Sequence, residues 1–261
     1  MNLLEKRMID HLKSIRDKHG AVGVKAEFEA EGTRTEELMR LKEIAMYAEV
    51  SFTLKVGGCE AVRDMVDARS VGVDHMVGPM IESGFALRKF VESVESVYSP
   101  EELEELEVLI NVETINTIRD LDSLYTAPAF SRLDGIVLGR GDLVESLGLP
   151  RSEVDCDACL THARAAIGRA KMMGKTTVMG GSITTASIDF IRKLPAETLD
   201  RYETRKICFS TKDALRLNPA EGIGEALDFE LMWLENKHNH YAAISDEDIS
   251  RIKALRSRKA V

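Results

Sequence analysis

The sequence predicts an α/β fold, a TIM-type (β/α)8 barrel formed by one domain. Its 261 residues are close to the ~250 that such a barrel usually contains. Hydrophobic residues make up 44% of the chain, which is sufficient for a substantial core. Short β-rich runs alternate with longer segments of helical period, and this pattern is typical of βαβ units and a parallel sheet. The expected domain spans 1–261, with an N-terminal capping helix within 1–20 and a C-terminal helical region over 220–261.

The first expected element is an amphipathic helix. Leu4, Met8, Leu12 and Ile15 recur on one face, and Gly20 ends the helix. We expect this helix to cover the bottom of the barrel.

Seven strands follow from apolar runs that end in turn residues. Gly57 and Gly58 end the second strand, for example, and Gly72 ends the helix after it. A complete barrel needs an eighth strand. It is expected near the N-terminal helix or between Ala186 and Tyr202, and otherwise the ring is irregular. The seven strands are expected at 22–28, 51–56, 75–80, 108–113, 133–138, 175–179 and 205–210. The helices between them are expected at 35–49, 59–71, 83–97, 115–124 and 154–173.

Charge and composition restrict the class of partner. The net charge of -9 and the pI near 5.3 argue against binding to nucleic acid or to an anionic membrane, because the field of the protein would repel both. No apolar run approaches the ~20 residues needed to cross a bilayer, and four cysteines are too few for a disulfide framework in a chain of this length. We therefore expect a cytoplasmic protein with a small-molecule partner.

The C-terminal region predicts a final barrel helix with an apolar stripe. If this helix presents the stripe to a neighbouring subunit, the protein is a homo-oligomer, and the sequence favours that interpretation. The apolar residues at helical spacing are Ile223, Leu227, Leu231 and Leu234, with Phe229, Trp233 and Tyr241 beside them.

Two carboxylates stand where a β/α barrel places its reacting groups, at the C-terminal ends of strands. Glu113 closes one apolar run, and Asp142 follows the next, 29 residues later (142 − 113), or about one βα unit. Adjacent parallel strands lie ~4.8 Å apart, so both carboxylates can bind one ion. So few oxygen ligands leave room for water and substrate, which suits Mg²⁺ or Mn²⁺. Alternatively, each carboxylate caps the helix after it.

Three stretches of the sequence resemble a known protein family. They are VGPMIESGFALRKF (77–90), INVETINTIRDLDSL (110–124) and LDGIVLGRGDLVESLG (133–148). Together they resemble the HpcH/HpaI aldolase and citrate lyase family of the phosphoenolpyruvate/pyruvate barrel superfamily. The resemblance implies that Glu113 and Asp142 hold Mg²⁺ or a similar ion, which chelates the carboxylate and keto oxygen of a 2-oxo acid.

The resemblance implies a metal-dependent carbon-carbon lyase or aldolase that acts through a pyruvate-type enolate. The metal would stabilise the enolate charge as a Lewis acid. Arg140, Gly141 and Asp142 would contact the substrate, with backbone amides around Gly141 binding its carboxylate. One alternative is a transferase or hydrolase that uses phosphoenolpyruvate on the same barrel, and another is a non-catalytic binding barrel.

One residue departs from the family pattern. Lys55 stands where family members usually place an arginine that contacts the keto oxygen. We expect Lys55 to stabilise the enolate electrostatically; its alternatives are a Schiff-base nucleophile or an ion pair with Glu27 or Glu60. Glu27, at the end of the first strand, is the candidate general base or water-holding residue.

Weaker signals complete the predicted site. Gly181 and Ser182 follow a strand and are candidates for binding an anionic part of the substrate. The segment 203–206 precedes a predicted strand, so it is expected at the bottom of the barrel, where charge usually serves stability. Cys156, Cys159 and His162 have a zinc-like spacing but fall in a predicted helix, so a structural role is favoured.

Overall fold

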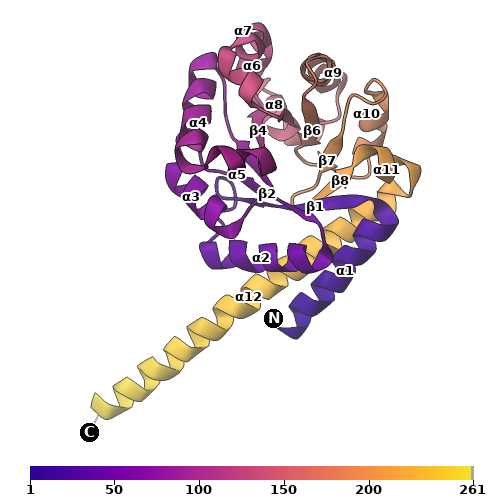
Figure 1. The fold of residues 1–261 in the computed structure, drawn as a ribbon. Coiled ribbons are helices and arrows are strands. Elements are labelled where there is room, and N and C mark those ends of the chain that lie inside the picture. The colour runs from indigo at the N-terminus through magenta and orange to yellow at the C-terminus, as the bar shows by residue number, and fades with distance from the viewer. Residues whose placement is uncertain (260–261) are drawn as a thin grey trace.

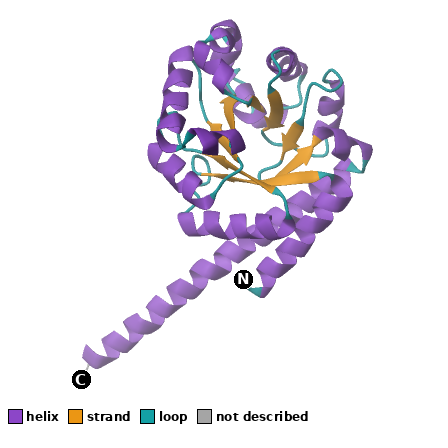
Figure 2. Cartoon of the chain, viewed as in Figure 1, coloured by secondary structure: helices purple, strands orange, loops and turns teal. Residues whose placement is uncertain are grey.

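Eight short strands close into a barrel in their chain order, and helices surround it, in the computed structural model, which describes residues 1–259 (Figures 1 and 2). The strands are β1 (Ala21–Glu27), β2 (Ser51–Lys55), β3 (His75–Gly78), β4 (Glu107–Val112), β5 (Gly135–Gly139), β6 (Thr176–Gly180), β7 (Arg201–Glu203) and β8 (Ile207–Ser210). The predicted TIM-type barrel and its seven predicted strands are confirmed. The eighth strand is β7, which begins inside the predicted interval 186–202.

The outer layer contains helices of very different length. The long ones are α1 (Leu3–His19), α2 (Thr35–Ala48), α3 (Val62–Val71), α4 (Gly84–Val97), α9 (Asp157–Met172) and α12 (Pro219–Lys259). The short ones are α5 (Pro100–Glu105), α6 (Ile115–Arg119), α7 (Leu121–Thr126), α8 (Arg140–Ser146), α10 (Ser187–Lys193) and α11 (Thr211–Arg216). Two 3₁₀ turns follow helices of this layer: Pro128–Arg132 comes after α7, and Arg151–Glu153 comes after α8.

The barrel is not parallel throughout. Strands β1 to β7 pair in parallel, whereas β8 runs antiparallel to both β7 and β1. Only residues 204–206 connect β7 to β8. A parallel crossover needs a dozen or more residues, so this short connection forces a hairpin, which the backbone hydrogen bond from Thr204 N to Ile207 O closes at 2.9 Å.

The reversed strand changes where the segment 203–206 lies. Because β7 is parallel to β6, its last residue, Glu203, is at the carboxyl end of the barrel together with the turn that follows. The prediction that 203–206 lies at the bottom is therefore wrong. It assumed that β8 runs in the same direction as the other strands.

The position of α1 also differs from its prediction. Its apolar face is buried as expected, including Met8, Leu12 and Ile15. It packs on the outside of β1 beside α2 and α12, however, and the side chain of Asn2 donates a 2.8 Å hydrogen bond to Asn236 of α12. The helix therefore belongs to the outer layer, and the prediction that it covers the bottom of the barrel is wrong.

Helix α12 has two parts with different surroundings. Its first part packs against α1 and buries Ile223, Phe229 and Trp233. Its remainder extends away from the barrel, as the yellow helix in Figure 1 shows. Among the described residues, no helix combines the length and apolar character needed to span a bilayer.

Alternate residues of the strands fill the inside of the barrel. Val77, Leu109, Val137 and Val178 form an apolar layer from four adjacent strands, β3 to β6. Asn111, two positions beyond Leu109 on β4, is polar, and Lys55 at the end of β2 is charged; both lie toward the carboxyl ends of the strands and line the cavity there. The apolar layer is therefore the floor on which a polar site is built.

Candidate active site

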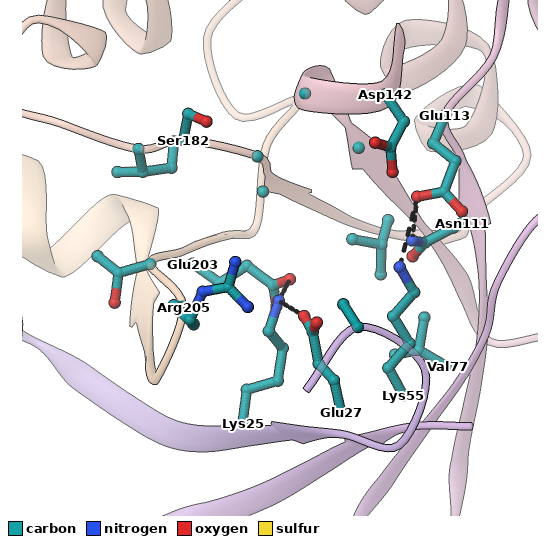
Figure 3. A pocket seen from close by; sticks show the side chains of 18 of the residues that line it. Lys25, Glu27, Lys55, Val77, Asn111, Glu113, Asp142, Ser182, Glu203 and Arg205 are labelled. Atoms are coloured by element: carbon teal, nitrogen blue, oxygen red, sulfur yellow. Dashed lines mark hydrogen bonds and ion pairs between the residues drawn. The ribbon is translucent and has the colours of Figure 1, made fainter. Parts of the chain in front are cut away.

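A cavity of about 380 Å³ opens at the carboxyl ends of the strands, and its volume lies in the range of small-molecule sites (Figure 3). The reversed hairpin and α12 complete its wall. The structure brings seven of the eight predicted site residues to this cavity: Glu27, Lys55, Glu113, Gly141, Asp142, Gly181 and Ser182.

Glu113 directly follows β4 and is almost completely buried, with 2% of its surface exposed. Its Oε1 accepts a 2.9 Å hydrogen bond from the backbone N–H of Met80, and its Oε2 accepts a 2.5 Å bond from Asn111 Nδ2. Burial raises the pKa of Glu113 above its usual value, although Lys55 opposes the shift. The fold thus presents a fixed carboxylate whose negative charge is only partly compensated.

Asp142 lies in the first turn of α8 and points toward the same space as Glu113 (Figure 3). The negative charge of Asp142 contributes to the raised pKa of Glu113. Between them lies Gly139, where any Cβ would approach Glu113 Oε2 to 2.8 Å, so a glycine is required for this close approach. In this structure Arg151 Nη2 donates a 2.7 Å hydrogen bond to Asp142 Oδ1.

A divalent cation fits the oxygen atoms gathered here. Besides the two carboxylates, Asn111 Oδ1 is buried and has no hydrogen-bond partner among residues 1–259. Hard cations such as Mg²⁺ bind oxygen ligands, often only one or two protein carboxylates with water and substrate completing the shell. Within the described chain, no group of three or more histidine, cysteine or carboxylate side chains is arranged for a metal. The pair Glu113 and Asp142 would thus form an open site.

Lys55 ends β2 and links the carboxylates of the pocket. Its Nζ lies 3.1 Å from Glu29 Oε2 and 3.6 Å from Glu113 Oε2. Burial alone would lower the pKa of Lys55, but Glu113, Glu27 and Glu29 outweigh it and raise the pKa. The ammonium form therefore predominates at neutral pH, which favours an electrostatic role over a Schiff-base nucleophile.

Glu27 belongs to a second ionic cluster in the pocket. Lys25 Nζ lies 2.9 Å from Glu27 Oε1 and 2.5 Å from Glu203 Oε1. Burial would raise the pKa of Glu27, but Lys25, Lys55 and Arg205 together lower it. Glu27 is therefore ionised at neutral pH and can accept a proton or a hydrogen bond from water.

Arg140 is directed away from the cavity. Its guanidinium is fully buried and is ion-paired with Asp155. It also donates to the backbone carbonyls of Gly180 at 3.3 Å and Gly181 at 2.9 Å, and to the Ser187 hydroxyl at 3.2 Å. Of the predicted substrate-binding residues, Arg140 is the one that does not line the pocket. It holds the loop after β6 against the start of α8.

That loop contains Gly181 and Ser182, which both line the cavity. Their φ angles of 83° and 52° are left-handed, and a Cβ at Gly181 would meet the backbone N of Gly141 at 2.5 Å. The loop is thus in direct contact with the turn that leads to Asp142. Cys156, Cys159 and His162 form no metal-binding group in the described part of the chain, and the Cys156 thiol instead caps α9 by accepting a hydrogen bond from Cys159 N.

The structure adds polar pocket residues that the sequence did not assign to the site, among them Lys25, Asn111, Arg151, Glu203 and Arg205. Strand alternation could have identified Lys25 and Asn111, because each lies two positions before a predicted site residue and points to the same side. Glu203 depends on β7, a strand that the sequence did not reveal, and Arg205 depends on the reversed β8. Arg151 lies in a 3₁₀ turn after α8 and had no sequence signal.

Comparisons with known proteins agree with this architecture. The family model described as HpcH/HpaI aldolase/citrate lyase matches residues 36–182, a segment that contains Lys55, Glu113 and Asp142. No curated protein matches the chain.

Similar solved structures include the HpcH/HpaI aldolase from Desulfitobacterium hafniense DCB-2, with a TM-score of 0.59 and 14% identity over 81% of this chain and 94% of that one. The citrate synthase SbnG has a TM-score of 0.55 and 16% identity over 70% and 86%. An HpcH/HpaI aldolase/citrate lyase family protein from Burkholderia cenocepacia J2315 has a TM-score of 0.54 and 13% identity over 70% and 88%. At these identities the likeness establishes the fold alone.

Proposed function

We propose that this chain, which belongs to the HpcH/HpaI aldolase/citrate lyase family, is a divalent-metal-dependent carbon-carbon lyase or aldolase that acts on a 2-oxo acid. Family membership gives the general class, an enzyme of aldolase or lyase type with a small-molecule substrate. The observation that carries the finer proposal is that Glu113 and Asp142 face one space inside the pocket, together with Asn111 Oδ1, which has no hydrogen-bond partner in the described part of the chain.

In this proposal Glu113 and Asp142 hold Mg²⁺ or Mn²⁺. The bound ion would act as a Lewis acid toward the negative charge that develops on the keto oxygen of the substrate. Gly141, Gly181 and Ser182 would contact the substrate itself, since all three line the same cavity. Arg140 would serve this binding indirectly, by fixing the Gly180–Gly181 loop.

Glu27 would accept a proton from the substrate, and Lys55 would stabilise the enolate that forms. Cleavage of a 2-oxo acid with a hydroxyl two carbons beyond the ketone needs a base for that hydroxyl. Glu27 would accept this proton directly or through a water molecule, the carbon-carbon bond would break, and an aldehyde would leave. The electron pair of the broken bond forms an enolate, which Lys55 would stabilise by its positive charge until C3 is protonated.

Exchange of the methyl protons of pyruvate with D₂O tests the proposed function. The protein with Mg²⁺ or Mn²⁺ is expected to catalyse this exchange. The last step of the lyase reaction protonates C3 of the pyruvate enolate, and the reverse of that step in D₂O replaces the methyl protons by deuterium. Proton NMR follows the loss of the methyl signal, and excess EDTA is expected to stop it. If phosphate release from phosphoenolpyruvate is catalysed instead, without exchange, the chain is a phosphoenolpyruvate-using enzyme.

A second prediction concerns Lys55. Lys55→Met is expected to lower the exchange rate by about 100-fold or more, a loss typical for one preorganised electrostatic contact. Lys55→Arg is expected to retain more activity than Lys55→Met because it keeps the charge. Borohydride treatment of the native protein with pyruvate, followed by mass spectrometry, checks the rival role. A stable adduct on Lys55 would show that it is a Schiff-base nucleophile.

We further propose that the protein is a homo-oligomer that uses α12. Leu231 and Leu234 are about half exposed on one face of this helix, and Ile249 and Ile252 continue that face at helical spacing where the helix extends beyond the barrel. Exposed apolar stripes of this kind mark subunit contacts. Leu231→Glu with Leu234→Glu is expected to convert the oligomer to a monomer in light scattering after size exclusion, whereas Leu217→Glu is not. A native monomer would contradict this proposal.

A further inference from the structure

Arg205 enters the pocket through the reversed hairpin. It lies in the turn between β7 and β8, lines the cavity, and its side chain is 49% exposed. In a barrel with eight parallel strands, the residue that precedes the last strand lies at the opposite end of the barrel. The antiparallel β8 is therefore the reason that this guanidinium is available to the site.

The guanidinium of Arg205 has free hydrogen-bonding capacity. Within residues 1–259 it donates no hydrogen bond, and its nearest carboxylates are Glu31 at 3.5 Å and Glu230 at 3.9 Å. The other pocket arginine, Arg151, donates to both Asp142 and Glu145, and the buried Arg140 is fully engaged by loop and helix groups. Arg205 is thus the arginine of the pocket whose planar fork is open to a ligand.

The pocket has two chemically different ends. Glu113, Asp142 and Lys55 lie together at one end, and Arg205 lies across the cavity from them, on the side of Ser182 (Figure 3). A 2-oxo acid bound at the first end directs its remaining carbon chain into the cavity. The far end of such a substrate therefore lies on the side of the cavity where Arg205 is located.

We propose that Arg205 determines specificity by binding a second carboxylate at the far end of the substrate, so that the preferred substrates are 2-oxo diacids. This inference rests on the proposed 2-oxo acid function. A carboxylate accepts two parallel N–H donors of a guanidinium, which makes the contact strong and directional. Phosphate has the same acceptor geometry, but Glu31 and Glu230 stand within 4.0 Å of Arg205 and would repel a dianion more than a monoanion.

Titration calorimetry on the Mg²⁺-loaded protein tests this with pairs of ligands that differ only in the far carboxylate. The pairs are 2-oxoglutarate with 2-oxopentanoate, and 2-oxoadipate with 2-oxohexanoate, so that two chain lengths are sampled. The native protein is expected to bind at least one diacid roughly 10- to 100-fold more tightly than its monoacid, the range for a hydrogen-bonded charge. Arg205→Ala is expected to bring that ratio close to one and to leave monoacid binding unchanged.

Arg192→Ala provides the matched control. Arg192 in α10 is also about half exposed and also lies near a carboxylate, that of Asp189 at 3.9 Å, but it does not line the cavity. Its variant is expected to keep the native preference. Equal binding of diacid and monoacid by the native protein, or equal weakening of both by Arg205→Ala, overturns the inference alone. If no 2-oxo acid binds at all, the proposed function itself fails and the inference fails with it.

Discussion

Glu113→Gln is expected to weaken metal binding and activity severely while the protein stays folded. Glutamine keeps the size of the side chain but removes its negative charge, so one of the two proposed ligands is lost. We expect Mn²⁺ affinity to fall at least about 100-fold, beyond the effect of losing an outer-shell partner. The pyruvate exchange rate is expected to fall by on the order of 1,000-fold, since the lost Lewis acid supplies several kcal/mol.

The pKa of Glu113 predicts the effect on stability. Burial raises this pKa in the folded protein, so ionisation of Glu113 opposes folding above the pKa of the unfolded chain. A neutral glutamine is therefore expected to leave the melting temperature at pH 7 unchanged or raised in the absence of metal. Calorimetry measures both the Mn²⁺ affinity and the melting temperature of the variant.

A matched control separates loss of a buried carboxylate from loss of the site. Glu5 of α1 is also buried, at 5% exposure, but its carboxylate contacts Asn2, Asn236 and Arg40 and does not line the cavity. Glu5→Gln is expected to bind Mn²⁺ normally. Native Mn²⁺ affinity in Glu113→Gln would instead show that this residue is not a metal ligand and would remove the basis of the proposed mechanism.

Arg140→Met is expected to cause the largest loss of stability among the residues around the site. Methionine removes every donor of a fully buried guanidinium and leaves the carbonyls of Gly180 and Gly181 without those partners, with Asp155 unpaired. Breaking a buried ion pair from one side typically costs about 3–5 kcal/mol. Asp155 is partly exposed, so we expect the lower part of that range, about 3 kcal/mol, in the free energy of unfolding measured with urea.

Arg164→Met serves as the control for this prediction. Arg164 also donates to a backbone carbonyl, that of Lys193, but it is exposed. Water replaces its lost contact, so we expect a change below about 1 kcal/mol. Equal stability of Arg140→Met and the native protein would show that the buried contacts of Arg140 do not hold the loop.

The candidate metal ligands Glu113 and Asp142 were predictable because their positions depend only on the order of strands and carboxylates along the chain. Glu113 directly follows a strand, Asp142 follows the adjacent strand, and parallel pairing of β4 with β5 places the two strand ends together. The direction of the Arg140 side chain was not predictable, although it stands two residues before Asp142. It depends on acceptors in the loop after β6 and on Asp155, which only the folded chain brings within reach.

The seven predicted strands were readable from their apolar runs, but β7 was not. Its three residues, Arg201, Tyr202 and Glu203, include two charged side chains, and their charges are compensated inside the barrel by residues from other strands. Arg201 pairs with Glu107 of β4, and Glu203 pairs with Lys25 of β1. A short run with this composition has no apolar pattern to detect.

The order of residues along the chain was sufficient to predict the repeated strand-helix order, the barrel fold and the strand-end carboxylates Glu113 and Asp142. Each of these follows from periodicity and from residue order along the chain. The structure was needed to show that β8 is reversed, that Arg205 and Glu203 reach the pocket, and that α1 joins the outer layer. The position of α1 depends on packing between segments far apart in the chain. The reversal of β8 follows from a three-residue connection, but it could not be foreseen because the strand before that connection, β7, has no apolar pattern.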